Sequence, residues 1–361
     1  MLKSDAHFND SFGVYPESVQ EFLRNFKQRH RVDDIIVNLR SLKNLRALVI
    51  GETIIDEYHS VTNLGKPLKG NHLSARFVSE ETYAGGILAC ANHMADFCGE
   101  IDLVTAMGKD DPKEKFVRSR LRPGINLYLS YTSSPTIVKR RFVDEAFKGK
   151  MFEVYYMDDR VLDDLEAEIK KTISDLLSKN NYDLVLVLDY GHGLMTKSLI
   201  YLLCAQSKFL AVNAQTNSAS IGYNLITKYP HASFYCLDDH EIRLAYQDKH
   251  GDILRLSRRL AEQVKIPGGI ALTLGHKGAL TYDAKNHQFF ETPTFSYKVV
   301  DTLGAGDAFI SVASPCVAAG FPMDLVGFIG NAVGAIKVGI IGNKSSVEAD
   351  SLYQFINALL K

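Results

Sequence analysis

Short, mostly apolar runs of four or five residues recur along the chain, and longer segments with helical periodicity separate several of them. The first run is ALVIG at residues 47–51, and others follow at residues 101–105, 184–188, 209–212, 233–237 and 270–274. Such runs are typical of strands that a parallel sheet buries on both faces. Helical patterns lie between runs, as at residues 163–179 and 252–264. The alternation predicts a three-layer α/β/α domain, doubly wound around a mainly parallel sheet.

Two segments, residues 57–82 and 136–157, depart from this alternation because they are richer in polar residues and β-formers. In the second, residues 136–143 and 151–156 flank AFKGK at 146–150, which is the pattern of a β-hairpin. We expect the two segments to form a small β-sheet that projects from the main body. We interpret it as a lid over an active site; a solvated extension without a role in chemistry is the alternative.

Residues 1–45 precede the first predicted strand and carry apolar residues at helical spacing, as in SVQEFLRNFKQRH. They are predicted to form a helical N-terminal extension that packs against the main body. Residues 46–361 are predicted to form one domain that includes the two lid segments. Pairing two lids would bury an exposed sheet face and edge, so a homodimer through the lid is expected.

Composition and charge exclude several classes of partner. The formal net charge is −1, without the basic surplus that a nucleic-acid-binding or membrane-surface protein usually carries. The five cysteines are an odd number, lie far apart and form no C-x-x-C pair, which favours buried thiols in a reducing cytoplasm. The apolar stretch at residues 308–320 is broken by Pro315 and is shorter than the roughly 20 residues of a membrane span.

The strongest chemical motif is DTLGAGDAF at residues 301–309. The preceding residues 295–300 have an extended pattern, and a buried apolar helix is predicted from Ala308 onwards. Gly304, Ala305 and Gly306 would therefore lie where a helix begins, with little side chain to shield their N–H groups from an anion. Such donors can stabilise the charge that develops on a phosphoryl group during its transfer.

Asp307 would lie in the first turn of that helix. A carboxylate there can accept the proton of a substrate hydroxyl as the hydroxyl attacks phosphorus, which makes Asp307 the candidate catalytic base. The alternative is a structural role, in which Asp307 caps the helix and the glycines form a turn.

The nine-residue string resembles the C-terminal signature of the ribokinase-like, or PfkB, carbohydrate kinases, and the resemblance extends from about residue 45 to the C-terminus. It implies a ribokinase-like fold and an enzyme that uses ATP and Mg²⁺ to phosphorylate a hydroxyl of a sugar or sugar phosphate. A monovalent cation also belongs to the cofactors that it allows. Within the family the chain looks most similar to the type that phosphorylates D-glycero-D-manno-heptose 7-phosphate, through residues 51–58, 136–142, 188–193 and 273–278.

The resemblance also implies a substrate side of the site. Asp56 would hold sugar hydroxyls, since a carboxylate can accept two hydrogen bonds from a diol. Gly85 and Gly86 would let the backbone approach the sugar closely. Lys139 and Arg141 alternate along a predicted lid strand and so face the same side, where two cations would suit a phosphate on the substrate. A solvated basic edge is the alternative for this pair.

On the nucleotide side, Thr273, Gly275 and Gly278 would border the adenine and phosphates, and Asn213 would lie at the end of a strand, where open parallel sheets bind ligands. Glu241 and Asp238 are the candidates for organising Mg²⁺, chiefly Glu241 through water. The alternative for these two residues is the N-terminal cap of a helix.

Two departures from the family pattern concern the sugar. The usual Gly-Gly-Ala-Ala-Asn is GGILA at residues 85–89, so that Ala89 replaces the substrate-binding Asn, and His192 stands where heptose kinases tend to have Lys. A kinase for another alcohol, such as fructose, fructose phosphate or a nucleoside, therefore remains an alternative. A sugar- or nucleotide-binding paralogue without catalysis is a further one.

Overall fold

A nine-stranded sheet forms the centre of the molecule in the computed structural model, which describes residues 15–110, 112–158, 160, 165–264, 266–296 and 298–361. The strand order is β13-β12-β11-β10-β9-β8-β1-β4-β5. Parallel pairing joins β11, β10, β9, β8, β1, β4 and β5, whereas β12 and β13 pair antiparallel. The strands are β1 Arg46–Gly51, β4 Glu100–Gly108, β5 Ile125–Thr132, β8 Leu184–Asp189, β9 Leu210–Ala214, β10 Phe234–Asp238, β11 Gly269–Thr273, β12 Ala279–Asp283 and β13 Gln288–Thr292. Each of the six predicted apolar runs overlaps one of these strands to within one residue, which confirms the predicted fold class.

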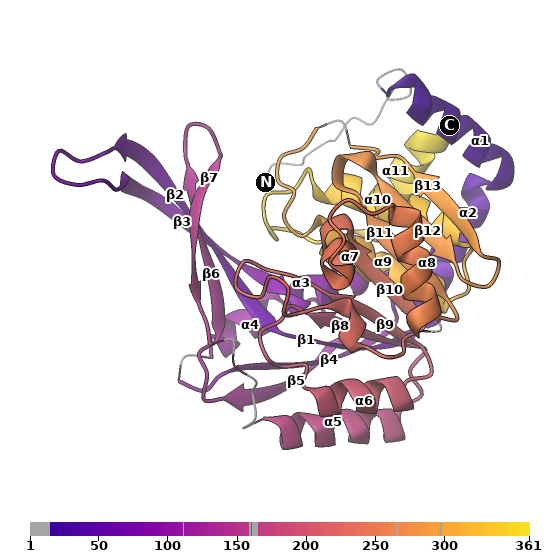
Figure 1. The fold of residues 1–361 in the computed structure, drawn as a ribbon, viewed down its shortest axis with the longest axis horizontal. Helices are drawn as coiled ribbons and strands as arrows, with labels where there is room; N and C mark the ends of the chain where they lie inside the picture. Colours follow the sequence, from indigo (N-terminus) through magenta and orange to yellow (C-terminus); the bar gives the residue numbers. More distant parts are fainter. Residues whose placement is uncertain (1–14, 111, 159, 161–164, 265, 297) are drawn as a thin grey trace.

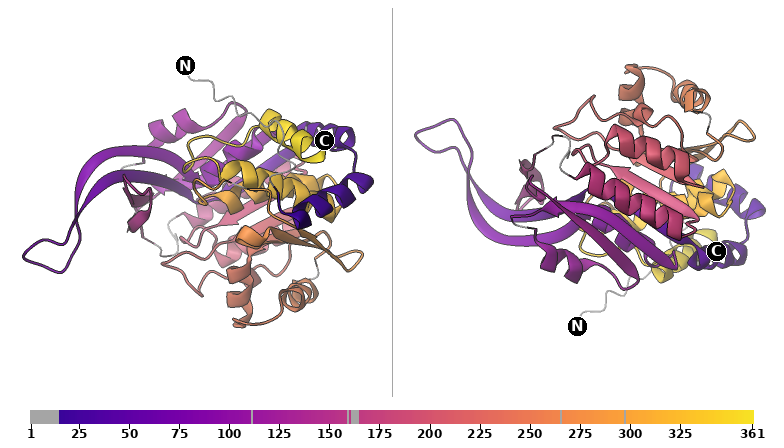
Figure 2. Two further views of the ribbon diagram at one scale, coloured as in Figure 1. Left: turned by 90° about the horizontal axis from the view of Figure 1, so that it is seen from above. Right: turned by 90° about the horizontal axis from the view of Figure 1, so that it is seen from below.

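Helices cover both faces of this sheet (Figures 1 and 2). Successive residues of β1 point to opposite faces: Ala47 and Val49 belong to one hydrophobic cluster, Leu48 and Ile50 to the other. The first cluster contains residues of α1 Glu17–Arg29, α2 Val32–Ser41, α3 Ile87–Met94, α9 Ala305–Ala318, α10 Met323–Lys337 and α11 Ala349–Leu360. The second contains residues of α5 Glu166–Lys179, α6 Lys197–Gln206, α7 Asp239–Tyr246 and α8 Ile253–Val264. The short helix α4 Glu114–Arg120 precedes β5.

Helices α1 and α2 lie within the region predicted as an N-terminal extension, and their apolar faces are part of the main core. Phe26 is fully buried and stacks on Phe328 of α10, with ring centroids 4.2 Å apart. Arg29 and His30 both contact the Asp324 carboxylate at the start of α10, at 2.5 and 2.8 Å. The first 14 residues of the extension lie outside the described residues.

A second, four-stranded sheet projects from the body and contains both predicted lid segments (Figures 1 and 2). Its order is β3-β2-β6-β7, with β2 parallel to β6 and the other pairs antiparallel. The strands are β2 Thr53–Gly65, β3 Ser74–Gly86, β6 Ile137–Asp144 and β7 Lys150–Tyr156. Strand β2 begins directly after β1, and β3 ends where α3 begins, so the lid is anchored next to the end of β1.

The sequence did not reveal three strands at the margins of the large sheet. Strand β5 alternates between exposed residues and residues that are half-buried or buried, and the β12–β13 hairpin adds an antiparallel edge, so neither has the continuous apolar run of a central strand. All five cysteines are free thiols, four of them buried. Among the described residues, no helix combines the length and apolar character needed to cross a bilayer.

Candidate active site

The candidate site lies at the carboxyl ends of the parallel strands, where open α/β sheets bind ligands. A cavity of about 250 Å³ there brings together predicted residues from separate parts of the chain. Its lining comprises Asn213, Gln215, Thr216, Cys236, Leu237, Asp238, Glu241, Thr273, Gly304, Gly306 and Asp307. The candidate base, the predicted anion-binding glycines and the predicted metal residues thus share one cavity.

Helix α9 begins at this cavity, as the DTLGAGDAF motif predicts. Gly304 is the residue before the helix, with φ of 73°, a left-handed conformation that glycine adopts without steric cost. Its carbonyl accepts the first helical hydrogen bond, from Ala308 N–H at 2.9 Å. The N–H groups of Gly306 and Asp307 belong to the first turn, which lacks intrahelical acceptors and carries the positive end of the helix dipole. The arrangement can receive an anion.

Asp307 is held in position by a side chain that sequence analysis did not single out. Gln215, which follows β9, donates from Nε2 to Asp307 Oδ1 at 2.5 Å. Burial raises the pKa of Asp307 to about 6; the Gln215 hydrogen bond works against this rise, and the nearby Asp56 carboxylate adds to it. A carboxylate with this pKa is ionised at neutral pH and close enough to that pH to exchange a proton.

A second cavity, of about 380 Å³, adjoins the first and shares Asp238, Thr273 and Gly306 with it. Gly275 and Gly278 also line it, so three predicted nucleotide residues surround one space. Its volume lies in the range of small-molecule sites, and the side chains of Val299, Phe309, Ala335 and Val338 give it apolar walls. The two cavities meet at the start of α9, as a nucleotide with its phosphates at the helix would require.

Glu241 and Asp238 form the N-terminal cap of α7. Asp238 Oδ1 accepts from Glu241 N–H at 2.7 Å, and Glu241 Oε2 accepts from Asp238 N–H at 2.8 Å. Burial, together with the Asp238 charge, raises the pKa of Glu241 to about 8. Among the described residues, no three His, Cys, Asp or Glu side chains are grouped to hold a metal ion. Because Glu241 Oε1 also accepts from Thr216 N–H at 3.1 Å, both Glu241 oxygens are engaged by the backbone, so a Mg²⁺ ion here would be held through its water ligands and not bound directly.

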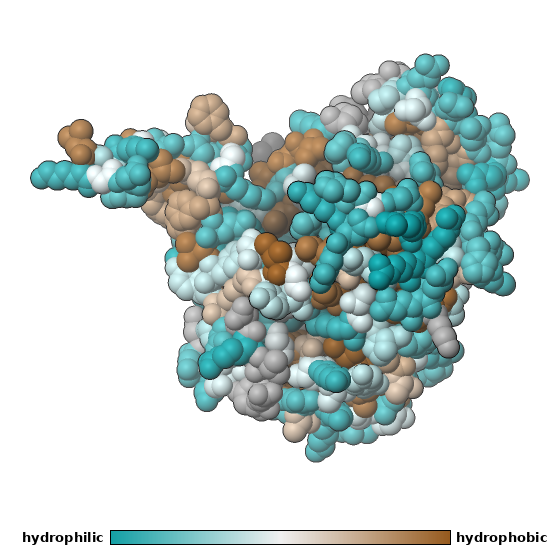
Figure 3. Space-filling model, in the orientation of Figure 1, coloured by the Kyte–Doolittle hydropathy of each residue, from teal (hydrophilic) through white to brown (hydrophobic). Residues whose placement is uncertain are grey.

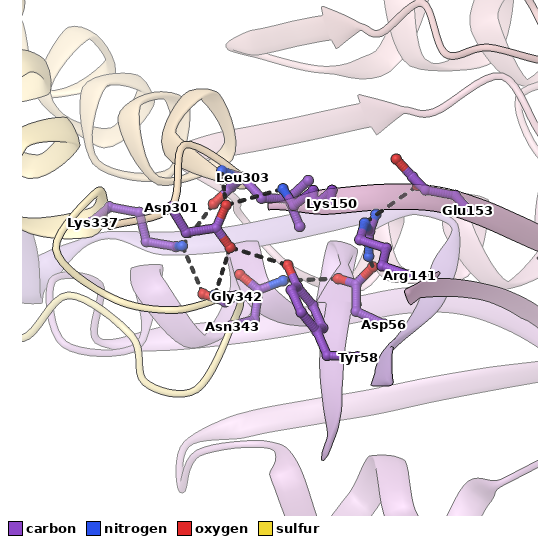
Figure 4. A network of polar contacts seen from close by, with 10 residues as sticks. All are labelled: Asp56, Tyr58, Arg141, Lys150, Glu153, Asp301, Leu303, Lys337, Gly342 and Asn343. Carbon is purple, nitrogen blue, oxygen red and sulfur yellow. Dashed lines mark hydrogen bonds and ion pairs between the residues drawn. The ribbon is translucent and has the colours of Figure 1, made fainter. Parts of the chain in front are cut away.

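The predicted sugar residue Asp56 is already paired with the predicted phosphate residue Arg141 (Figure 4). Arg141 Nη1 lies 2.5 Å from Asp56 Oδ1, and Asn343 donates from Nδ2 to Asp56 Oδ2 at 3.0 Å. A second contact joins Arg141 Nε to Glu153 Oε2 at 3.3 Å. Gly85 makes room for this carboxylate, because a Cβ at Gly85 would lie 2.0 Å from Asp56 Oδ2. The Asp56 carboxylate is therefore oriented by Arg141 from the lid and by Asn343 from the body.

Lys139 lies on the same side of β6 as Arg141 but has no carboxylate contact of comparable length among the described ion pairs. Its Nζ lies 5.2 Å from the Tyr155 ring centroid, and burial lowers its pKa. His192 is buried near Lys139. Burial lowers the pKa of the His192 imidazole to about 3, and the charge of Lys139 adds to this shift. Neither ring nitrogen of His192 has a hydrogen-bond partner in the described part of the chain. Lys139 and His192 are therefore polar groups available to a ligand.

Asp301, the first residue of the motif, connects the lid to the body (Figure 4). Its carboxylate accepts from Tyr58 of β2 at 3.2 Å and from Lys150 of β7 at 3.1 Å. It also accepts from the N–H groups of Leu303 and Gly342, which hold its pKa below the usual value even though burial opposes the shift. Lys337 and Asn343, like Gln215, were not predicted. Only Lys337 leaves a sequence signal, as a lone lysine in an apolar helix.

Comparison with known proteins gives a family match over most of the chain. Residues 44–350 match the pfkB family carbohydrate kinase model. The bifunctional protein HldE of Azotobacter vinelandii is 25% identical over 308 residues, which cover 82% of this chain and 60% of HldE. HldE of Shewanella baltica strain OS185 is 23% identical over 313 residues, covering 86% of this chain and 63% of the relative. The chain thus spans about three fifths of the length of these relatives.

Solved structures with the same fold confirm the ribokinase-like architecture. Ribokinase from Thermotoga maritima superposes with a TM-score of 0.65 at 18% identity, covering 87% of this chain and 99% of that enzyme. Phosphofructokinase-2 from Escherichia coli, solved in complex with potassium, has a TM-score of 0.69 at 12% identity and covers 88% and 100%.

Proposed function

Because the chain belongs to the pfkB family of carbohydrate kinases, we propose that it transfers the γ-phosphoryl group of ATP to a hydroxyl of a sugar or sugar phosphate. The observation that carries this proposal is the position of Asp307. Its carboxylate and the first-turn amides of α9 lie where a nucleotide-sized cavity meets a polar cavity at the strand ends. One group can accept the hydroxyl proton there while the other receives the migrating phosphoryl.

Each residue has one task in the proposed reaction. ATP lies along Thr273, Gly275 and Gly278, with its phosphates directed to the glycine-rich start of α9, where the N–H groups of Gly306 and Asp307 lack intrahelical acceptors. When bound, Mg²⁺ would supply positive charge that offsets the triphosphate, and Glu241 and Asp238 would hold its water ligands.

Asp56 orients the sugar, and Asp307 removes the hydroxyl proton as oxygen attacks phosphorus. Gln215 orients the Asp307 carboxylate and favours its ionised form, because an amide N–H donates better to a carboxylate than to a carboxylic acid.

A heptose 7-phosphate-like sugar is the favoured substrate. Supporting it are the HldE relatives, the Lys139 ammonium group, which lies near the Asp56 carboxylate, and His192, which lies near Lys139. Arg141 contributes less to binding of a substrate phosphate than its position in the sequence suggests, because its charge is already paired with the carboxylates of Asp56 and Glu153. A phosphate on the substrate would find Lys139 as the nearest cation without a carboxylate of its own.

A kinase for another alcohol is the second candidate. Ala89 and His192 both depart from the family pattern on the sugar side, and proteins of the same fold include phosphofructokinase-2 and ribokinase. A binding paralogue without catalysis is the third, although the paired Asp307 and Gln215 argue against it.

A coupled ADP-release assay across a panel of sugars and sugar phosphates separates the three candidates. We expect turnover with a phosphorylated heptose. Turnover only with fructose, fructose 6-phosphate or a nucleoside would support the second candidate. Absence of ADP release with every alcohol, alongside measurable ligand binding, would support the third and contradict the proposed activity.

We also propose that two lids pair in a homodimer. The outer half of β3 is exposed over residues 75–81, and an isolated two-stranded ribbon is only marginally stable in water. Figure 3 shows apolar patches on the surface of the lid. Exposed large apolar residues there include Phe77, Phe152 and Val154. Sedimentation at micromolar protein should give a dimer, and Phe77→Asp should shift it toward the monomer. A wild-type monomer under these conditions would contradict the proposal.

A further inference from the structure

Lys337 is a fully buried lysine whose ammonium group joins two main-chain segments beside the start of α9 (Figure 4). It is the last residue of α10, and its Nζ donates to Leu303 O and to Gly342 O, both at 2.8 Å. Leu303 immediately precedes the glycines of the proposed phosphoryl site, and Gly342 lies in the segment after α10. The lysine therefore connects the approach to α9 with the loop that also carries Asn343.

Burial of an ammonium group costs free energy, and the packing of α10 does not require a charged side chain at this position. Desolvation lowers the pKa of Lys337, and the carboxylates of Asp301, Asp307 and Asp56 oppose that shift. The rest of α10 is mostly apolar, so an apolar side chain would suit the helix. The lysine is bound to carbonyl oxygens, and its charge faces the residues that we assign to the reaction.

The ammonium group also lies close to the proposed anion-binding turn. A Cβ built on Gly304 would lie 3.3 Å from Lys337 Cε and 3.5 Å from Nζ. By fixing the Leu303 carbonyl, the lysine fixes the chain direction that leads into Gly304, Ala305 and Gly306. Its positive charge adds to that of the helix N-terminus at the place where phosphoryl charge would develop.

The same oxygens would otherwise suit a monovalent metal ion. Carbonyl oxygens from two loops, together with the Asp301 carboxylate, form the type of oxygen set that binds K⁺ or Na⁺. In this chain Lys337 Nζ is bonded to both carbonyls, and Asp301 accepts from Leu303 N–H and Gly342 N–H. The residues present here therefore do not fit a monovalent cation at this position, although the family resemblance allows one.

We propose that Lys337 is a positioning residue that acts as a built-in cation, ordering the start of α9 for phosphoryl transfer without a monovalent metal ion. The proposal rests on the proposed kinase function, and it concerns the same site.

The first test compares the wild-type protein in potassium chloride and in choline chloride at equal ionic strength. We expect kcat and the melting temperature to be the same in both salts. A several-fold higher kcat in potassium chloride than in choline chloride, or a higher melting temperature in potassium chloride, would overturn the proposal. The melting temperature needs no sugar substrate, so it tests the cation site even if no tested sugar is phosphorylated.

The second test uses Lys337→Ala, with Lys344→Ala as the matched control. Lys344 lies in the same segment but is exposed and paired with Glu81 at 3.4 Å. Lys337→Ala should lower kcat by about 10²-fold, as loss of a preorganised charge-stabilising group does, with the KM for ATP changed much less. Ammonium or potassium ions, but not choline, should raise both kcat and melting temperature of this variant, while Lys344→Ala should match the wild type.

Two results of the second test would count against the proposal. One is a wild-type kcat in Lys337→Ala; the other is a folded variant with low kcat that no small cation restores. If Lys337→Ala does not fold, Lys337→Arg replaces it, and we then expect kcat to be retained in choline chloride because the cation is kept. Loss of activity in a folded Lys337→Arg that neither potassium nor ammonium restores would overturn the proposal.

Discussion

The chemistry proposed for this protein depends on how one carboxylate is kept both half-buried and ionised. Asp307 lies at a helix start, partly enclosed, with Gln215 donating to one oxygen. Its pKa is raised to about 6 from an ordinary 3.8, chiefly by burial. The value leaves the carboxylate available above pH 6 and protonated below it.

Turnover should therefore fall as pH drops through about 6, because protonated Asp307 cannot accept the proton of the substrate hydroxyl. In a pH profile of kcat/KM for the sugar, we expect a tenfold decrease for each unit below that value. Gln215→Leu removes a hydrogen bond that favours the charged form, so its inflection should move to higher pH. A wild-type profile that stays flat down to pH 5 would contradict the assignment.

At the scale of single elements, strand β6 presents neighbouring cations to opposite sides. Lys139 and Arg141 point toward Asp56, whereas Arg140 Nε contacts Glu57 Oε2 on the other side at 2.7 Å. The alternation of a strand makes this arrangement predictable from the sequence. The Asp56–Arg141 pair was not predictable, because it joins residues 85 positions apart and depends on how β2 and β6 pair.

This alternation provides a matched pair of variants. Lys139→Met should raise the KM for a phosphorylated sugar by at least roughly tenfold, as loss of a charged partner of phosphate does, and leave the KM for ATP nearly unchanged. Arg140→Met, on the opposite side of the same strand, should change neither constant. Equal effects of Lys139→Met on both substrates would argue against a phosphate contact. Arg141→Ala is a poorer test, because it would leave Asp56 buried without its counter-ion.

The edge strands explain why only some of the strands could be predicted from the sequence. Central strands β1, β8, β9, β10 and β11 have continuous apolar runs since both faces are covered, and each was predicted. Strand β5 and the β12–β13 hairpin form the two margins of the sheet, where one face or edge meets solvent and the run is interrupted.

For the whole molecule, the N-terminal helices behave as part of the body even though the family match begins at residue 44. Phe26 has no exposed surface, and Tyr15 donates to the Phe295 carbonyl at 2.9 Å. Phe26→Ala should lower the free energy of unfolding by about 3–5 kcal/mol, as large cavities in a core do. Val37→Ala in α2, where the side chain is 62% exposed, is the control and should change little. Calorimetry of both variants measures the difference, and a small effect of Phe26→Ala would show that α1 is only loosely docked.

Assembly of the site is also a property of the whole chain. The motif at residues 301–309 was sufficient to predict the helix start and the candidate base. Three further side chains reach the same region from other parts of the chain: Gln215 from the segment after β9, Lys337 from α10 and Asn343 from the segment after α10. No local sequence pattern marks their partners. Which distant side chain completes a site is decided by packing that no window of sequence contains.

Replacement of Asp307 by Asn tests whether this carboxylate is the base that accepts the hydroxyl proton. Asn keeps the shape and one oxygen but cannot accept the proton, so single-turnover phosphorylation should slow by about 10²–10⁴-fold with ATP binding retained. The variant should also fold well: ionised Asp307 opposes folding above pH 6 and not below about 4, since its pKa is raised in the folded state, so Asn should be at least as stable at pH 8. Near wild-type turnover in a folded Asp307→Asn protein would rule out Asp307 as the catalytic base.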